Sequence, residues 1–391
     1  MRSGTVVKDL CALILSAVLA GSAIAQETIK IGLILPMTGP FASTGRQIEA
    51  AAKLYMQQNG PVVAGKTIEL IVRDDTGAAD VTKRIAQELV VNAKVSFLAG
   101  FGLTPLALAT APIATQAKVP QVVMAAATSI ITEHSPYIVR TSFTLPQVTI
   151  AIADWAARNG IRTVATLVTD YGPGLDAEKA FKERFANRGG LVVEELRVPL
   201  RNPDFAPFLQ RVADARPDAV FVFVPSGIGS VFMKQFAERG LDKSGIKLIA
   251  TGDVTDDDIL GNMGEVALGV VNAHHYSAAH PSPKNKAFVE AFRNASNGMR
   301  PNFMAIGGYD GMHLIYEALK KTGGKADGDA VIAAMKGMSW VSPRGPVSID
   351  PATRDIVQNV YIRKVERVGG ELYNVEFDTF EAVKDPGKAA R

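Results

Sequence analysis

The sequence predicts an α/β protein made of two doubly wound lobes with a ligand cleft between them. Three observations predict this class. Short β-branched runs alternate with longer helical patterns, the alternation restarts near residue 151, and extended segments stand where the chain would pass from one lobe to the other. Strands of about four to eight residues separated by helices of about ten or more are typical of parallel sheets covered on both faces.

The first series of elements opens on the run TIKIGLIL, which is rich in β-branched residues and too short for a buried helix. A turn with two prolines follows it, and the helical and strand patterns then alternate. The predicted order is a strand at 28–35, a helix at 43–58, a strand at 67–72, a helix at 80–91, a strand at 95–99, a helix at 105–117 and a strand at 121–124.

The second series repeats this rhythm after a helix at 151–158. Its elements are a strand at 163–168, a helix at 173–188, a strand at 191–198, a helix at 205–213, a strand at 219–224, a helix at 230–239 and a strand at 246–250. Two series of similar size predict two lobes, each with a sheet wound on both faces.

Two extended segments, 137–145 and 270–277, are the predicted passages between the lobes. Helices at 284–296, 303–320 and 330–335 would return to the first lobe, and a strand pair at 357–365 and 371–377 would end in the second. The expected domains are therefore 26–141 plus 277–355 and 142–276 plus 356–391. Three hinge crossovers of this kind permit closing about a cleft while preventing free tumbling.

The first 25 residues read as a secretory signal peptide. Arg2 and Lys8 precede an apolar run at 10–20, and small residues up to Ala25 predict cleavage before Gln26. The run is about half of the ~20 residues that a membrane span needs. Cys11, the only cysteine, lies inside this segment. We therefore expect a periplasmic protein, free of disulfides, that relies on its core for stability.

Composition excludes several classes of partner. The chain has a net charge of +3, 47% apolar residues and 21% charged residues, as a globular protein does. The sequence has no basic stripe interleaved with aromatic residues, which disfavours nucleic acid as a partner. No second apolar run of membrane length follows the leader. A monomer without cofactor is the expectation.

The segment GFGLTP at 100–105 follows a predicted strand and opens a helix. It begins like a dinucleotide fingerprint, but Pro105 stands in place of the third glycine and no acidic residue ends the next strand, which disfavours a nicotinamide site. A plain connecting turn is one interpretation. The other is a cradle for a carboxylate, in which Thr104 adds its hydroxyl to the free N–H groups of a helix N-terminus.

The next strand end, AAATS at 125–129, has the same character. Small side chains leave backbone N–H groups accessible, and Thr128 or Ser129 supplies a hydroxyl. Two neighbouring strand ends of this type could bind both oxygens of an anion without an arginine. The alternative is that Thr128 or Ser129 only caps the following turn.

Several motifs together resemble one family. The runs ETIKIGLILPMTGPFASTGRQIEAA, VRDDTG and TDYGPG, with the segments around Thr104 and Ala126, look like the periplasmic solute-binding proteins of branched-chain amino acid ABC transporters. The resemblance covers nearly the whole chain after the leader, and it implies Rossmann-like lobes of the type I periplasmic binding fold. It also implies that Thr104 and the Ala126 to Thr128 segment grip a ligand carboxylate, that Tyr171 closes on the ligand, and that Asp253 meets its ammonium group.

The departures from the family pattern concern the ligand. Pro225 and Ser226 stand where amino acid binders have a tyrosine. Thr44 stands where an aromatic residue often forms the wall of the ligand's side-chain pocket, and this smaller residue leaves room in the pocket. Relatives that carry aromatic carboxylates exist in the same family, so the fold does not select the ligand. Phe101, Leu103 and His275 complete the expected set of ligand contacts. Asp253, if buried and ionised, needs a cation such as an α-ammonium; otherwise it is an exposed turn residue.

His274, His275 and His280 lie within seven residues of one another. Zinc is disfavoured, because no cysteine or helical histidine pair accompanies them and neighbouring histidines on a strand face opposite sides. A hinge position facing the cleft is the preferred interpretation. The sequence shows no motif for a nucleophile with its base, no metal-binding helix and no phosphate loop. It therefore does not indicate an enzyme.

The expected function is capture of a small carboxylate by lobe closure and its delivery to the membrane permease of an ABC importer. A branched-chain or other hydrophobic amino acid is the first expectation for this ligand. The alternative ligand is an aromatic carboxylate of the phenylpyruvate or hydroxycinnamate type. An exported α/β enzyme is the remote alternative from another class.

Overall fold

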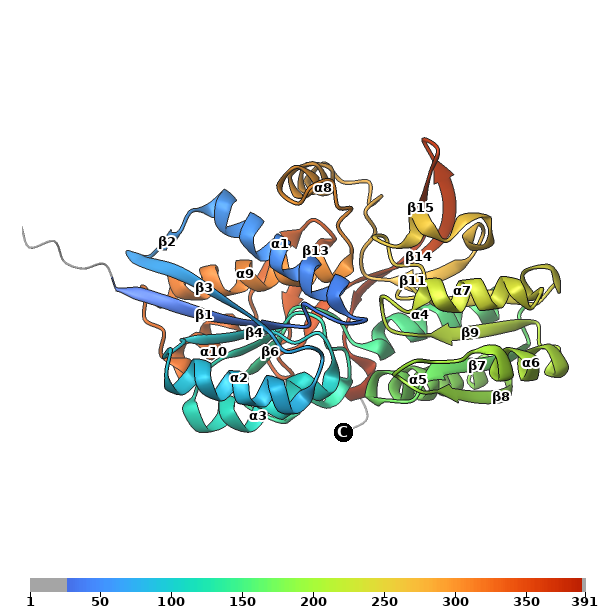
Figure 1. Cartoon of the computed structure of the whole chain (residues 1–391), viewed down its shortest axis with the longest axis horizontal. Coiled ribbons are helices and arrows are strands. Elements are labelled where there is room, and N and C mark those ends of the chain that lie inside the picture. The colour runs from blue at the N-terminus through green and yellow to red at the C-terminus, as the bar shows by residue number, and fades with distance from the viewer. Residues whose placement is uncertain (1–26, 389–391) are drawn as a thin grey trace, which may run out of the picture.

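The computed structural model describes residues 27–388, and the predicted signal peptide lies outside this range. Two sheets, each covered by helices, form two lobes that meet in the middle of the molecule (Figure 1). No helix in this range is long and apolar enough to cross a membrane. The two-lobed, doubly wound α/β class predicted from the sequence is confirmed.

The first sheet has the order β2-β3-β1-β4-β5-β6, and every pair except β2 with β3 is parallel. One face packs on α1 and α9 and the other on α2 and α3, through separate apolar clusters. Its strands are β1 (Thr28–Leu35), β2 (Val62–Val63), β3 (Lys66–Asp74), β4 (Phe97–Gly100), β5 (Gln121–Val123) and β6 (Ile138–Arg140). The helices of this lobe are α1 (Ala42–Asn59), α2 (Ala79–Val91), α3 (Thr104–Ala117), α8 (Pro283–Ala295), α9 (Phe303–Lys321) and α10 (Gly328–Met335).

The second sheet runs β12-β13-β14-β11-β10-β9-β7-β8, with β15 on β14. The strands from β8 to β11 are parallel, and those after them antiparallel. Its strands are β7 (Thr163–Thr169), β8 (Leu191–Val198), β9 (Ala219–Phe223), β10 (Lys247–Thr251), β11 (Val271–His274), β12 (Ser339–Ser342), β13 (Gly345–Ile349), β14 (Ile356–Val368) and β15 (Glu371–Val383). Its helices are α4 (Leu145–Arg158), α5 (Gly172–Ala186), α6 (Ala206–Ala215) and α7 (Gly229–Glu238). Short 3₁₀ turns are η1 (Ser129–Glu133), η2 (Leu241–Lys243), η3 (Leu260–Asn262), η4 (Gly264–Ala267) and η5 (Pro386–Lys388).

Two segments differ from the expected elements. Helix α4 begins at Leu145 rather than near 151, because Thr144 and Gln147 form a capping box that starts it directly after the first crossover. Strands β12 and β13 lie within 277–355 but pair in the second sheet. The expected domain boundaries therefore stay a prediction, although sheet membership favours a switch to the second lobe before residue 339.

Candidate functional site

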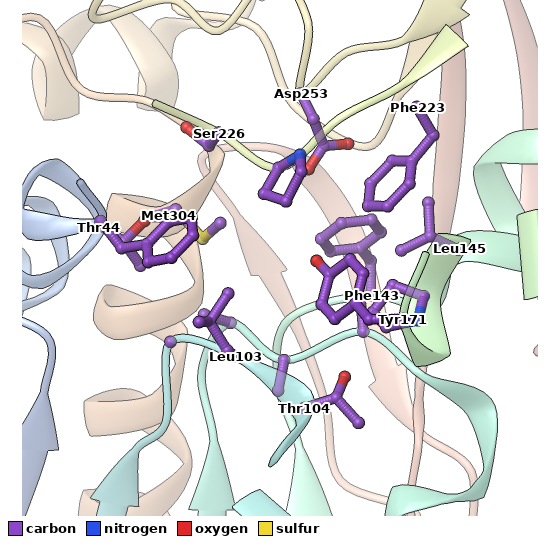
Figure 2. A pocket seen from close by; sticks show the side chains of 17 residues that line it. Thr44, Leu103, Thr104, Phe143, Leu145, Tyr171, Phe223, Ser226, Asp253 and Met304 are labelled. Atoms are coloured by element: carbon purple, nitrogen blue, oxygen red, sulfur yellow. The ribbon is translucent and has the colours of Figure 1, made fainter. Parts of the chain in front are cut away.

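A cavity lies between the lobes, bordered by the segments that follow the carboxyl ends of parallel strands in both sheets (Figure 2). It contains about 370 Å³ of space free of protein atoms, which includes its opening to solvent. Its lining residues are Phe41, Thr44, Gly102, Leu103, Thr104, Ala125, Ala126, Ala127, Phe143, Leu145, Tyr171, Pro173, Phe223, Pro225, Ser226, Asp253 and Met304.

A sharp turn after β4 brings Thr104 to one end of the cavity. Gly100 has a φ of +105°, and a Cβ atom there would lie 2.4 Å from the carbonyl oxygen of Ile34, so only glycine fits. Thr104 is the first residue of α3. In this first turn Pro105 has no N–H, and the amides of Leu106 and Ala107 donate to the carbonyl of Leu103 at 3.1 and 3.3 Å. Among residues 27–388 no partner is found for the N–H of Thr104, so this one amide of the turn is available to an anion.

The hydroxyls of Thr104 and Thr128 lie 2.8 Å apart and are both buried. A hydroxyl has one hydrogen to donate, so one threonine donates to the other and the second hydrogen remains for a ligand. Thr128 is held by this bond but is not itself among the residues that line the cavity. The pair therefore acts as one hydroxyl donor shared by two strand ends.

The backbone after β5 supplies the next donor. The N–H of Ala126 donates to the carbonyl of Phe101 at 3.0 Å and is therefore occupied. No partner for the N–H of Ala127 is found within residues 27–388, and Ala127 lines the cavity. The available donor of this segment is thus the amide of Ala127, which lies within the Ala126 to Thr128 segment expected from the sequence.

Aromatic side chains form the walls of the cavity. Tyr171, just before α5, stacks on Phe223 with ring planes 15° apart and centroids at 6.1 Å. Phe143, from the crossover between β6 and α4, and Phe41, next to α1, also line it. Burial, with a smaller effect of Asp253, holds the pKa of the Tyr171 phenol well above its ordinary value, so this ring is neutral. The walls fit a flat apolar group.

Asp253 lies at the end of the cavity opposite Thr104 (Figure 2). It follows β10 and is only 3% exposed. Its Oδ2 atom accepts the hydroxyl of Thr251 at 2.9 Å and lies 3.5 Å from Nε2 of His274. No hydrogen bond to Oδ1 is formed within the described part of the chain, so this oxygen is available to a ligand donor.

His274 is a neutral support for Asp253. Burial lowers the pKa of this imidazole to about 4, even though the nearby Asp253 acts to raise it. The Nδ1 atom of His274 accepts the N–H of His275 at 3.0 Å. In the neutral ring the proton is therefore on Nε2, which faces Asp253.

The other histidines of this segment, His275 and His280, contact side chains of the protein and do not line the cavity. The rings of His274 and His275 lie 4.5 Å apart instead of on opposite faces, because β11 ends at His274 and the strand alternation stops there. His280 bonds Glu376 at 2.8 Å. Across residues 27–388, no group of three or more His, Cys, Asp or Glu side chains is arranged to hold a metal ion.

The two lobes are in contact around the cavity. The N–H of Ser129 in the first lobe donates to Asp176 of α5 at 2.8 Å, and Asn302 donates to Asp256 at 2.9 Å. Ser43 of α1 bonds Asp258 of the second lobe. At Gly172 a Cβ atom would lie 2.6 Å from Oγ1 of Thr128, so glycine allows this close approach. These contacts describe a closed form.

The structure brings together most, but not all, of the residues that the sequence singled out. Those that line the cavity are Thr44, Leu103, Thr104, Ala126, Tyr171 and Asp253. Thr128 does not line the cavity but is hydrogen-bonded to Thr104, which does. Phe101 has a φ of +67°, and its side chain is buried in the apolar cluster on the far side of the sheet. His275 is buried 4.9 Å from the Phe143 ring and does not line the cavity.

Sequence reasoning missed the residues that shape the walls, chiefly Phe41, Phe143, Phe223 and Met304. Phe41 and Phe223 each lie within a few residues of motifs already singled out, so proximity to a strand end was an available signal. Phe143 gave none, because the segment 137–145 shows no periodicity that would reveal which side chain faces the cavity.

Comparisons with known proteins agree with this geometry. A family model described as periplasmic binding protein matches residues 28–371. The Leu/Ile/Val-binding protein homolog 6 of Brucella melitensis biotype 1 is 48% identical over 377 residues, which are 95% of this chain and 97% of the relative.

Two solved structures are similar over almost their whole length. The solute binding protein of an ABC transporter from Rhodopseudomonas palustris BisB5, in complex with 3,4-dihydroxybenzoic acid, is 70% identical with a TM-score of 0.91, covering 92% of this chain and 99% of that one. The solute binding protein from Rhodopseudomonas palustris HaA2, in complex with p-hydroxybenzoic acid, is 46% identical with a TM-score of 0.90, covering 93% and 100%.

Proposed function

Because this chain belongs to the periplasmic binding proteins and is a solute-binding protein of an ABC transporter, we propose that its ligand is a hydroxylated benzoate. The protein captures this acid in the periplasm by closing its lobes and delivers it to the membrane permease. Its role is binding without catalysis. The predicted signal peptide accounts for its export.

One observation carries the proposal: hydrogen-bond donors for a carboxylate and a hydrogen-bond acceptor, Asp253, lie at opposite ends of a cavity with aromatic walls. Thr104 and the Ala127 amide supply hydrogen-bond donors at one end, and Asp253 supplies an acceptor at the other. A benzoate with a hydroxyl at ring position 4 matches this order, because its anion, flat ring and donor lie along one line. The anion would gain charge-assisted hydrogen bonds, and the hydroxyl would bond a charged acceptor.

An α-amino acid fits the arrangement less well. Its ammonium group is attached one carbon away from the carboxylate, whereas Asp253 lies across the cavity from Thr104. Pro225 and Ser226 occupy the wall where amino acid binders have a tyrosine. An ammonium group near the cradle would therefore be buried against Leu103 and the alanines, with a large desolvation cost.

The relatives support both classes of ligand. The two Rhodopseudomonas palustris proteins were solved with hydroxylated benzoic acids, and the one at 70% identity carries a dihydroxylated ring. The Brucella melitensis relative is named for leucine, isoleucine and valine. A hydrophobic amino acid is therefore the competing candidate, with Asp253 as the partner of its ammonium group.

Calorimetric titration of the ligand-free chain 26–391 separates the candidates. The panel is 4-hydroxybenzoate, 3,4-dihydroxybenzoate, benzoate, 4-hydroxycinnamate, phenylpyruvate, leucine and valine. We expect the hydroxybenzoates to bind most tightly, and the longer acids more weakly because the cavity is small. Tighter binding of leucine or valine than of every aromatic acid would overturn the proposal.

A further inference from the structure

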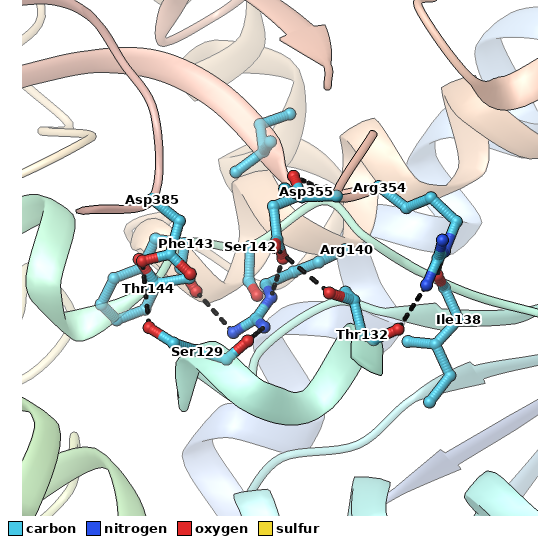
Figure 3. Close-up of polar contacts among 12 residues, drawn as sticks. Ser129, Thr132, Ile138, Arg140, Ser142, Phe143, Thr144, Arg354, Asp355 and Asp385 are labelled. Atoms are coloured by element: carbon cyan, nitrogen blue, oxygen red, sulfur yellow. Dashed lines mark hydrogen bonds and ion pairs between the residues drawn. The ribbon is translucent and has the colours of Figure 1, made fainter. Parts of the chain in front are cut away.

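A fully buried arginine lies directly behind the carboxylate cradle. Arg140 ends β6, is 0% exposed and does not line the cavity (Figure 3). Its Nε atom pairs with Asp355 at 2.8 Å. The rest of the guanidinium bonds three backbone carbonyls, those of Ala126, Phe143 and Ser129, each at 3.3 Å. Two of these residues, Ala126 and Phe143, are part of the cavity wall.

The bond to Ala126 determines where the neighbouring amide points. In a trans peptide the carbonyl of one residue and the N–H of the next point in opposite directions. Arg140 and Ser142, which do not line the cavity, both donate to the carbonyl of Ala126, the second at 3.4 Å. The N–H of Ala127, which is the free donor of the cradle, is thereby directed into the cavity.

The charge of Arg140 is balanced locally. Asp355 pairs with it and also bonds Lys388, while Asp385 accepts the hydroxyls of Ser129 and Thr144 at 3.0 Å. Acids and bases alternate behind the cradle, so attraction of the ligand by a bare positive charge is not the main effect. The fixed fork of the guanidinium, which reaches several carbonyls at once, is what a lysine in this position lacks.

We propose that Arg140 is a positioning residue for carboxylate recognition. It acts through the Ala126–Ala127 peptide and never touches the ligand. The inference rests on the proposed function for the identity of the ligand, but it concerns the anionic end alone. Arg140 reaches the wall around the ring only through the backbone carbonyl of Phe143, so recognition of the neutral ring and its hydroxyl should depend on it less.

The test compares an acid with its uncharged analogue. Arg140→Lys keeps the charge and loses the fork. We expect the affinity for 4-hydroxybenzoate to fall at least ~10-fold, as a lost buried hydrogen bond to a charged group does, and the affinity for 4-hydroxybenzamide to fall less than about 3-fold. Equal losses for the acid and the amide would overturn the inference, because a merely structural role lowers both alike.

Arg354→Lys is the matched control. Arg354 also bonds backbone carbonyls, that of Ile138 at 3.0 Å, that of Ser135 at 3.4 Å and that of Thr132, but it does not reach the cradle. Its substitution should leave the ratio of acid to amide affinity unchanged. A fall in this ratio equal to that of Arg140→Lys would also overturn the inference.

Ser142→Ala covers the case in which Arg140→Lys does not fold. It removes only the second donor to the Ala126 carbonyl, and should lower the acid-to-amide ratio by about 2-fold or more. An unchanged ratio counts against the inference. If the wild-type chain binds leucine and no aromatic acid, the proposed function fails, and leucine with leucinamide then replace the pair of ligands in the same test.

Discussion

The hydroxyl oxygens of Thr104 and Thr128 lie 2.8 Å apart and join the ends of β4 and β5, two neighbouring strands of the first sheet. Each residue comes from a different turn, and each side chain is 4% exposed. The bond restrains both side chains and leaves one hydroxyl hydrogen of the pair for a ligand. A site organised in this way loses little side-chain entropy on binding.

Thr104→Val should weaken 4-hydroxybenzoate binding by about 1–3 kcal/mol, or about 5- to 150-fold in Kd. Valine has the same shape but lacks the donor, and it leaves the hydroxyl of Thr128 without its partner. Calorimetry on the purified variant measures the change. Thr104→Ser, which keeps the hydroxyl, should stay within about 3-fold of wild type. An unchanged Kd for Thr104→Val would remove this residue from the site.

Asp253→Ala should distinguish between ligands that differ only in the ring hydroxyl. The affinity for 4-hydroxybenzoate should fall by about 1.5–3 kcal/mol, the range for a hydrogen bond to a charged group. Benzoate has no donor for Asp253, so its affinity should be nearly unchanged. The comparison of the two ligands in both proteins isolates the interaction with the hydroxyl.

Asp242→Ala is the control for this pair of titrations, because Asp242 is an exposed aspartate of the same lobe. It should change neither affinity. Equal losses of benzoate and 4-hydroxybenzoate in Asp253→Ala would mean that Asp253 supports the closed form instead of the hydroxyl.

The sequence predicted the strand ends of the site better than its walls. Thr104 and Asp253 follow predicted parallel strands, and the carboxyl ends of such strands meet at one edge, so both could be placed from the chain alone. Phe101 was placed wrongly because its positive φ turns the side chain away from the cavity, although Leu103 two residues later lines it. No sequence pattern reports such a backbone angle for phenylalanine.

Residues whose role depends on long-range packing were not predictable. Arg140 was read as part of an extended crossover, and its partner Asp355 is 215 residues away in the chain. Strands β12 and β13 form a short hairpin that includes Pro346 and lies at the edge of the second sheet. Pro346 is the second residue of β13 and precedes the pairing of this strand with β14, which begins at Val347; a proline at the start of a strand is tolerated but weakens the local signal for one.

Ser43→Ala should lower the affinity for every ligand by the same factor, of about 2- to 10-fold. Ser43 of the first lobe bonds Asp258 of the second, so the substitution removes a contact that joins the two lobes in the closed form. A ligand that requires the closed form then binds less tightly, whatever its chemistry. Titrations with 4-hydroxybenzoate and benzoate measure both factors.

Ser244→Ala tests whether the effect of Ser43→Ala is specific. Ser244 donates to Leu241 within the second lobe, just before β10 begins, at the end of the strand away from the cavity. Its substitution should leave both affinities unchanged. Unequal losses for the two ligands in Ser43→Ala would show that Ser43 contributes to ligand recognition instead of closure.

Acid should destabilise the protein through His274. Burial lowers the pKa of this imidazole from 6.5 in the unfolded chain to about 4 in the folded one. Between these values the unfolded state binds a proton that the folded state does not, so the free energy of unfolding falls as pH falls. At about 1.4 kcal/mol per pH unit, this one group accounts for about 3 kcal/mol. Urea unfolding at about pH 7 and about pH 5 measures most of this loss.

The contribution of His274 is separated from that of the other buried groups by substitution. Burial raises the pKa values of the Asp256 and Asp257 carboxyl groups, so their protonation in acid stabilises the folded state. The change in the free energy of unfolding of the wild-type protein with pH is the sum of these effects and that of His274. His274→Gln should flatten the fall between the two pH values by about 2 kcal/mol. His134→Gln, at an exposed position, should leave it unchanged. If His274→Gln keeps the wild-type slope, the imidazole takes up its proton equally in the folded and unfolded states.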